Sequence, residues 1–392
     1  MPYIDESALD DQQALAALDS RQTLRALATA GAQVRHAVDL AAEARFERLT
    51  GGERPRSVLV AALGGSAVIA DVLELLAEPA SPVPIHVRRN LPLPGWVGAM
   101  DLVVAVSQSG HAEGPVALAA EAARRGAALL TIGAADSPLA EVAARARGIH
   151  VAVPVGSMSS RTALWAMLTP VLLGAHAIGM VDAGPAVMAR VADRLDEQAS
   201  AFRPSSEAFV NPAKALACEL AEGVPVVLGD GPLTGVAACR AAAMLARTAR
   251  IPATWGELPD AASQVVSCFD GPFTDAGASA GMPRDADISE SIFTDPYLDG
   301  PPAPKLRLLL LRDDGAEVVD DRTRLLADAV ARTARDAGVK VSEHSTEPGH
   351  ALERFAGLVA LTDFAAVYLA LGLGMDPGLS PHVADLRDFT GE

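Results

Sequence analysis

The stretch Ser57-Val-Leu-Val-Ala-Ala-Leu-Gly-Gly-Ser66 decides the fold of this chain. Its unbroken apolar run is typical of a strand that is buried on both faces of a parallel sheet, and the two glycines favour a tight turn into a helix. Further strand-like and helical segments alternate downstream, at 70–76, 84–88, 101–107, 116–125, 127–132 and 149–153. Strand–helix–strand order at these lengths predicts an α/β fold with a doubly wound parallel sheet.

The C-terminal half begins the same pattern again. An apolar run at 224–228 ends in Gly229-Asp230-Gly231, and strand-like or helical segments follow at 234–250, 305–311, 321–337 and 340–345. This weak internal duplication predicts two doubly wound parallel-sheet domains in tandem. We place the first domain at 1–205, with N-terminal helices over 8–48 and bridging helices over 158–202, and the second at 206–392 with helices at its C-terminus.

Residues 270–304 interrupt the second domain. The segment is rich in Gly, Pro, Asp and Ser, a composition that cannot pack a core. We expect a long surface loop or a lid there, because its acidic residues lack the spacing of a calcium-binding loop.

The net charge and the apolar runs of the chain limit the classes of molecule that it can bind. Of the 392 residues, 32 are Lys or Arg and 49 are Asp or Glu, giving a net charge of −17, which disfavours nucleic acid and anionic lipid. One long apolar run, 164–181, contains Pro170 and two glycines, so a buried helix is a better interpretation than a membrane span. We therefore expect a small-molecule ligand, and neither nucleic acid nor membrane.

The cysteines and the N-terminus point to a reducing compartment. Cys218, Cys239 and Cys268 are odd in number and form no C-x-x-C pair, which argues against a disulfide framework or a zinc site. The acidic start, Met1 to Glu6, does not resemble a signal peptide. We expect a cytoplasmic protein with neither a zinc site nor a disulfide framework.

Two predicted strand ends carry groups suited to a phosphate. Gly64-Gly65-Ser66 opens a helix whose N-terminus attracts anions, and the glycines permit close backbone approach. Ser107-Gln-Ser109-Gly110-His111 supplies hydroxyls and a glycine before the next helix. Either segment alone could be a plain strand–turn–helix with capping serines. Because ligands of open parallel sheets bind at the carboxyl ends of strands, the two together predict a phosphate site.

These segments resemble the signature of sugar-isomerase (SIS) domains. Other segments, in the same order along the chain, resemble the bifunctional phosphoglucose/phosphomannose isomerase family over roughly residues 20–390. They are Arg88-Arg-Asn-Leu-Pro92, residues 156–164 with Ser160-Arg161-Thr162, Arg250-Ile-Pro-Ala253, Glu257-Leu-Pro259, Tyr368-Leu-Ala-Leu371 and Asp376-Pro377.

The resemblance implies a homodimer that interconverts glucose or mannose 6-phosphate with fructose 6-phosphate, without metal or cofactor. It also implies roles for matching positions. Ser66, Ser107 and Ser109 would hold the phosphate. Gly65 and Gly110 belong to the same phosphate-binding loops, where His111 could pair with the phosphate as a cation or equally face solvent. Arg161 would lie near the sugar C1–C2 region and stabilise enediolate charge.

The chain departs from the family where the catalytic pair should be. Aligned on Ile251-Pro-Ala253 and Leu258-Pro259, the position of the family's glutamate base is Arg247 and that of its ring-opening histidine is Ser263. Arginine stays protonated at neutral pH, so it cannot act as the base. The threonine that usually follows the serine loop is Ala112, which removes one phosphate-binding hydroxyl.

Relocated groups could replace the pair. Glu257, beyond the end of the helix that carries Arg247, is a candidate base, although a surface or structural glutamate would look the same. His350, before a predicted helix, is a candidate acid, although a capping or solvent-exposed histidine fits equally.

Three functions therefore stay open. The sequence favours a hexose 6-phosphate-binding SIS protein without the usual isomerase chemistry. The alternative is an active phosphohexose isomerase with relocated acid and base. A purely structural dimer is the weakest hypothesis, because both serine loops are retained.

Overall fold

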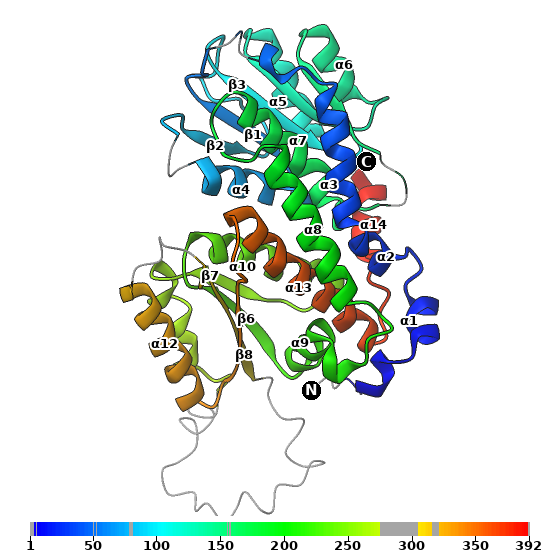
Figure 1. The fold of residues 1–392 in the computed structure, drawn as a ribbon, viewed down its shortest axis with the longest axis vertical. Coiled ribbons are helices and arrows are strands. Elements are labelled where there is room, and N and C mark those ends of the chain that lie inside the picture. Colours follow the sequence, from blue (N-terminus) through cyan, green and yellow to red (C-terminus); the bar gives the residue numbers. More distant parts are fainter. Residues whose placement is uncertain are drawn as a thin grey trace, which may run out of the picture. The chain divides into compact units, whose positions relative to one another are not determined.

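The computed structural model describes residues 4, 6–49, 51, 53–77, 81–154, 156, 158–274, 305–315 and 321–390. The chain forms two compact units, each discontinuous in sequence. We call Thr23–Ser200 with Gly349–Ala356 the N-terminal unit, and Met1–Gln22, Ala201–Pro348 and Gly357–Glu392 the C-terminal unit. Figure 1 labels the helices and strands of both units.

The N-terminal unit is built on a five-stranded parallel sheet of order β2-β1-β3-β4-β5. Its strands are β1 (Val58–Ala62), β2 (Ile85–Arg88), β3 (Leu102–Ser107), β4 (Ala128–Gly133) and β5 (Ile149–Ala152). All residues of β1 and β3 are buried, as expected for central strands covered on both faces. The predicted doubly wound parallel sheet is confirmed.

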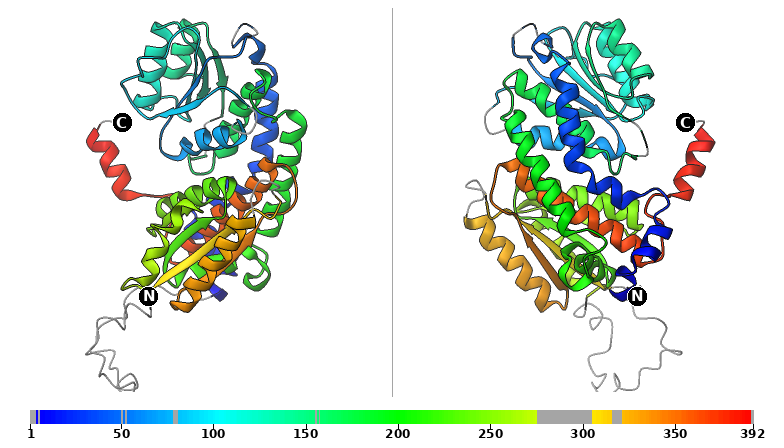
Figure 2. Two further views of the ribbon diagram at one scale, coloured as in Figure 1. Left: turned by 90° about the vertical axis from the view of Figure 1, so that its left-hand side faces the viewer. Right: turned by 45° about the vertical axis from the view of Figure 1, so that its right-hand side comes forward.

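Helices cover both faces of this sheet (Figure 2). The helices of this unit are α2 (Thr23–Ala28), α3 (Ala30–Ala42), α4 (Val68–Ala77), α5 (Glu113–Arg124), α6 (Pro138–Arg145), α7 (Leu164–Ala177) and α8 (Pro185–Ala201), of which α3 to α7 contact the strands. On one face, Leu118 of α5 and Leu139 of α6 pack against Leu59 and Val103. On the other, Gly174 of α7 lies against Leu130 of β4.

The helices predicted as continuous stretches are interrupted. The 8–48 region contains α1 (Gln12–Leu18), α2 and α3. The backbone N–H of Asp19 makes the last hydrogen bond of α1, and Gln22 then adopts a positive φ of 52° before α2. The 158–202 region breaks between α7 and α8, where Gly179 has a φ of 70°. The apolar run that starts at Leu164 is α7, and its residues 164–175 are all buried, as predicted.

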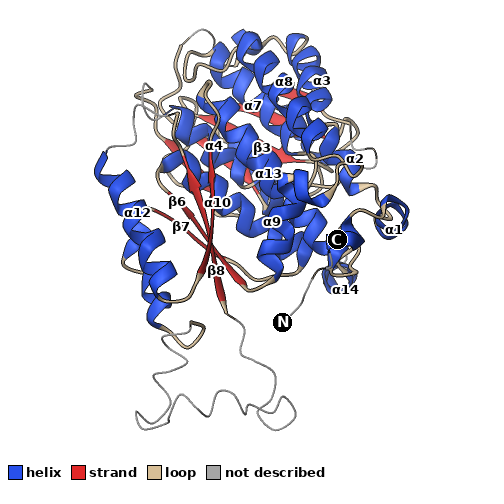
Figure 3. Cartoon of the chain, turned by 60° about the horizontal axis from the view of Figure 1, so that its bottom comes forward, coloured by secondary structure: helices blue, strands red, loops and turns tan. Residues whose placement is uncertain are grey.

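The C-terminal unit repeats the architecture with a four-stranded parallel sheet of order β7-β6-β8-β9 (Figure 3). Its strands are β6 (Val224–Gly229), β7 (Thr254–Glu257), β8 (Leu306–Arg312) and β9 (Lys340–Ser345). Its helices are α1, α9 (Pro212–Ala221), α10 (Pro232–Met244), α12 (Asp321–Asp336), α13 (Ala351–Gly372) and α14 (Pro381–Thr390). A π-helical turn, Leu245–Ala249, extends α10.

Two features of this unit differ from the expectation or fall outside it. The sequence pattern did not predict β7, a short edge strand whose Thr254 and Trp255 are exposed. Most of the segment predicted as a loop or lid, residues 275–304, lies outside the described residues. Its described start is packed, since Thr274 is buried and the carbonyl of Phe273 accepts a backbone hydrogen bond from Leu306.

Within the described residues, α13 is long and apolar enough to span a membrane by length and composition. In its most apolar window, 89% of the residues are buried inside the protein. A core helix of a globular protein meets the same criteria, and the burial of α13 agrees with that role.

The N-terminal segment is fixed to the C-terminal unit by a buried lysine. Lys214 of α9 is fully buried, and its Nζ donates to Asp10 Oδ1 at 2.9 Å and to the carbonyls of Pro204 at 2.9 Å and Ser206 at 2.7 Å. Asp10 Oδ1 also accepts the backbone N–H of Ala208 at 2.9 Å. One ammonium group therefore ties residues 10, 204 and 206 to α9.

We predict that Lys214→Ala lowers the free energy of unfolding by about 3–5 kcal/mol, because it leaves a carboxylate and two carbonyls without their shared donor. The matched control is Lys340→Ala, which removes a lysine whose side chain is 69% exposed and pairs with Glu222. That change should cost less than about 1 kcal/mol. Urea denaturation measures both, and similar losses in the two variants would contradict the prediction.

Candidate functional site

The Gly-rich turn after β1 leads directly into α4. Gly64 has a φ of 59°, which favours glycine, and Gly64–Ser66 form one 3₁₀ turn. Ser66 is 4% exposed, and its hydroxyl donates to Met167 Sδ of α7 at 3.7 Å. This contact is weak, so the hydroxyl can rotate towards a better acceptor.

The loop after β3 is held by its own serines. Ser107 Oγ accepts the N–H of Ala112, and Ser109 Oγ accepts the N–H of His111, both at 3.3 Å. Among the described residues, neither serine hydroxyl donates its proton to an acceptor. Each oxygen is therefore used as an acceptor within the loop, while its O–H group stays available for an anionic ligand.

His111 lies at the outer side of this loop. It is exposed, and its Nδ1 is 2.8 Å from the carbonyl oxygen of Ser109, so that nitrogen carries the proton in this arrangement. Nε2 is then left as the ring nitrogen that can face a ligand or solvent.

Gly110 seats the loop against the start of α6. Its φ is 71°, and a Cβ there would lie 2.2 Å from Ser137 Oγ. Ser137 caps α6 by accepting the N–H of Ala140 at 3.3 Å, and it donates to the carbonyl of Ala134 at 2.7 Å. A side chain at 110 would displace this cap, so glycine is required both by conformation and by space.

Arg161 belongs to a turn that is tied to the serine loop. Gln108 Nε2 donates to the carbonyl of Met158 at 2.7 Å, and Ser159 Oγ accepts the N–H of Arg161 at 3.3 Å. Arg161 itself is half-buried. The structure thus links the 158–162 turn to the loop that carries Ser107 and Ser109.

The sequence analysis missed several residues at this edge of the sheet. Gln108 and Ser137, which position the loop, belong to no motif that a sequence would show.

Asp71 of α4 is half-buried. Burial raises the pKa of its carboxyl group, and the nearby Arg89 guanidinium opposes the shift. The carbonyl of Arg89 packs against Gly114 at the start of α5, where a Cβ would lie 2.0 Å away. Asp71 is therefore an ionisable group of this unit that the motifs did not indicate.

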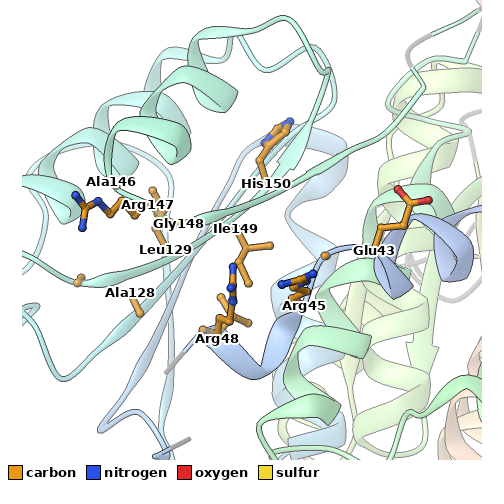
Figure 4. A pocket seen from close by; sticks show the side chains of 13 residues that line it. Glu43, Arg45, Arg48, Ala128, Leu129, Ala146, Arg147, Gly148, Ile149 and His150 are labelled. Atoms are coloured by element: carbon orange, nitrogen blue, oxygen red, sulfur yellow. The ribbon is translucent and has the colours of Figure 1, made fainter. Parts of the chain in front are cut away.

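A cavity of about 370 Å³ lies elsewhere in the N-terminal unit (Figure 4). Arg45, Arg48 and Arg147 line it, together with the residues at the beginnings of β4 and β5. It therefore opens at the amino ends of the strands, on the opposite edge of the sheet from the serine loops, and it contains none of the predicted site residues.

The described residues contain no group of three or more His, Cys, Asp or Glu side chains arranged to hold a metal ion. Cys218, Cys239 and Cys268, all among the described residues, form no disulfide bond. Burial, with smaller contributions from nearby carboxylates, raises the pKa of Cys218 to about 11, so its thiol is unreactive at neutral pH.

Residues 209–389 match the family model of the bacterial phospho-glucose isomerase C-terminal SIS domain. The chain also resembles the bifunctional phosphoglucose/phosphomannose isomerases in sequence. The member of that family from Caldicellulosiruptor bescii is 26% identical over 196 residues, which are 50% of this chain and 57% of that protein. The alignment thus covers little more than half the length of this relative.

Solved structures extend the likeness in fold to the whole chain. A hypothetical protein from Thermus thermophilus matches with a TM-score of 0.67 and 13% identity, over 98% of this chain and 93% of that one. A glucose-6-phosphate isomerase-like protein from the same organism matches with a TM-score of 0.54 and 17% identity, over 97% and 98%. At these identities the likeness establishes the fold, two SIS-type α/β domains in tandem.

The residues aligned with the SIS-isomerase catalytic pair lie in the C-terminal unit. Arg247 sits in the π-helical turn after α10, half-buried, and its charge acts on the buried Asp363. Ser263 is exposed, and its hydroxyl donates to the carbonyl of Asp260 at 3.4 Å. The assignment of these positions to the catalytic pair remains a prediction.

The two proposed substitutes have local structural contacts. Glu257 ends β7, and its carboxylate packs against Gly235 in the first turn of α10. His350 precedes α13, and its Nδ1 accepts the N–H of Leu352 at 3.2 Å, which makes it a helix cap. Burial lowers the pKa of His350, favouring the neutral ring that this hydrogen bond requires.

We predict that Gly110→Ala lowers the free energy of unfolding by about 2–4 kcal/mol, because it adds a clash with Ser137 to the strain of a positive φ. Gly64→Ala is the matched control: it has a similar φ, but no atom lies within 4 Å of the added Cβ. It should cost only about 1–2 kcal/mol. Chemical denaturation compares the two variants, and equal losses would show that the packing of Gly110 on Ser137 is unimportant.

Proposed function

We propose that this protein binds a hexose 6-phosphate through the loops after β1 and β3, without the usual isomerase chemistry. The observation that carries the proposal is the pair of serines, Ser107 and Ser109, whose oxygens accept backbone N–H groups and whose hydroxyl protons have no acceptor among the described residues. A phosphate dianion is an acceptor that such protons suit.

The surroundings support an anion at this edge. The turn Gly64-Gly65-Ser66 lies directly before the N-terminus of α4, where backbone N–H groups favour an anion. Gly110 and His111 complete the loop after β3. Residues 63–67 and 107–112 include no Asp or Glu, although the chain as a whole carries a net charge of −17. A locally uncharged turn with available hydroxyls can bind phosphate despite that overall charge.

The missing acid and base argue against isomerisation. An aldose–ketose exchange needs a group that carries a proton between C1 and C2. In the alignment proposed above, that position holds Arg247, whose guanidinium keeps its proton, and the ring-opening position holds the exposed Ser263. Arg161 can stabilise negative charge on a bound sugar but cannot by itself move the proton.

The alternative is an active glucose-6-phosphate/mannose-6-phosphate isomerase that uses Glu257 as base and His350 as acid. The contacts of both residues favour structural roles, because Glu257 packs on α10 and His350 caps α13. The family relationship also leads us to propose a homodimer in the cytoplasm that acts on a small phosphorylated sugar and requires no cofactor.

The binding test uses glucose 6-phosphate and mannose 6-phosphate in calorimetric titration and thermal shift. Ser107→Ala should weaken binding about 10- to 100-fold, because it removes a hydrogen bond to a charged phosphate worth about 1.5–3 kcal/mol. Ser267→Ala, at an exposed serine of the C-terminal unit whose hydroxyl donates to the carbonyl of Gln264, should leave the affinity within about twofold. Absence of binding by the unmodified protein to any hexose 6-phosphate would refute the proposal.

A coupled assay with both sugar phosphates separates the two functions. We expect no turnover above the uncatalysed rate. Turnover that Glu257→Gln abolishes while binding persists would instead establish the relocated-base isomerase.

A further inference from the structure

The two sheets place the same kinds of segment at their carboxyl edges. In each unit a central strand, β1 or β6, ends in a Gly-containing turn and is followed by a helix, α4 or α10. In each, the neighbouring strand, β3 or β8, ends beside that turn in parallel register. The loops after β6 and β8 are therefore the counterparts of the loops proposed to hold the phosphate.

In the C-terminal unit a carboxylate already joins these two loops. Asp230, in the turn after β6, accepts at Oδ1 the N–H of Asp313 at 2.9 Å. The hydroxyl of Thr234 lies 3.1 Å from the same oxygen and shares its one proton between Asp230 and the carbonyl of Gly231, at 3.0 Å. Asp313 follows β8, and Thr234 lies in the first turn of α10. A backbone N–H from one strand end and a hydroxyl from the following helix are the donors that a phosphate oxygen would take.

Asp230 is enclosed there. It is 1% exposed, and Thr234 is fully buried. The second carboxylate oxygen, Oδ2, has no hydrogen-bond partner among the described residues and lies 3.9 Å from Nε of Arg312. Burial raises the pKa of this carboxyl group, while the bonds from Asp313 and Thr234 oppose the shift. A carboxylate in this place is thus held against a desolvation penalty.

A second buried acid, Asp313, disfavours an anionic ligand at the carboxyl edge of the C-terminal sheet. Asp313 is 2% exposed, and its Oδ1 accepts the hydroxyl of Thr346 at 2.9 Å, directly after β9. The guanidinium of Arg312 is shared with Asp328 at 2.7 Å and Glu343 at 3.1 Å, so it does not offset both buried acids. The corresponding loops of the N-terminal unit, residues 63–67 and 107–112, carry no acidic residue.

We propose that the Asp230 carboxylate occupies the phosphate cradle of the C-terminal unit and thereby confines phosphate binding to the N-terminal unit. The comparison of the two cradles rests on the proposed function, whereas the occupied state rests on contacts inside the C-terminal unit alone. Asp230 is then a specificity-determining residue: it makes the tandem protein bind one sugar phosphate per chain.

The test replaces Asp230 by glycine, the residue found at Gly65 in the counterpart turn. Calorimetric titration with inorganic phosphate, at an ionic strength matched with sodium chloride, should give about one site per chain for the unmodified protein and about two for Asp230→Gly. In a Ser107→Ala background, which weakens the first site, Asp230→Gly should restore phosphate binding. Asp230→Asn keeps the volume filled and should add no site.

Further variants keep the result decisive. Asp328→Asn removes a carboxylate that contacts Arg312 but not the cradle, and it should add no site. Asp230→Gly/Asp313→Asn also removes the second buried charge while keeping its backbone N–H. If Asp230→Gly lowers the melting temperature, phosphate should raise that temperature again, more than chloride does.

Two outcomes separate the claims. If both glycine-containing variants fold by circular dichroism and show no additional phosphate binding or phosphate-specific stabilisation, the occupied-cradle proposal is wrong. If the unmodified protein binds no hexose 6-phosphate, the proposed function fails, while a gain of inorganic phosphate binding in the Asp230→Gly variant still reports on the C-terminal cradle.

Discussion

The parallel pairing of β1 with β3 is the constraint on which the N-terminal site depends. Ala62 lies opposite Val106, so the turn at Gly64 and the loop that starts at Ser107 leave the sheet at the same edge. Both strands are buried on both faces, and polar groups can therefore be placed only at their ends. The position of the serines follows from strand pairing before any ligand is considered.

The same constraint explains what a sequence can predict. Buried central strands are long apolar runs, so β1, β3, β4, β6 and β8 are visible in the sequence, and the turns after β1 and β3 follow from them. The edge strand β7 has no such run, because Thr254 and Trp255 face solvent and glutamate ends it. An edge strand is paired on one side only, and its residues need not be apolar.

Contacts between segments that are distant in the chain could not be predicted from the sequence, for a different reason. The bond from Gln108 to the carbonyl of Met158, which ties the Arg161 turn to the serine loop, uses an amide that could bond to any carbonyl. The ion pair between Asp10 and Lys214, which attaches the N-terminal segment, could not be predicted either, because a lysine on a helix is ordinarily exposed. Composition shows that a side chain is polar, but only the fold shows which partner it meets.

Phosphate-binding loops are also needed for folding, whereas a catalytic base is a single side chain. A protein can therefore keep phosphate binding after it has lost proton transfer. The loops proposed to bind phosphate depend on strand pairing, on glycines such as Gly110 that packing requires, and on serines that also hold the loop through backbone N–H groups. Their loss would damage the domain itself. A catalytic base is one side chain at one position, and its replacement by an arginine leaves a helix such as α10 and its π-turn intact. A protein can therefore lose a catalytic pair through two substitutions, while the requirements of stability preserve the loops at the ends of its central strands.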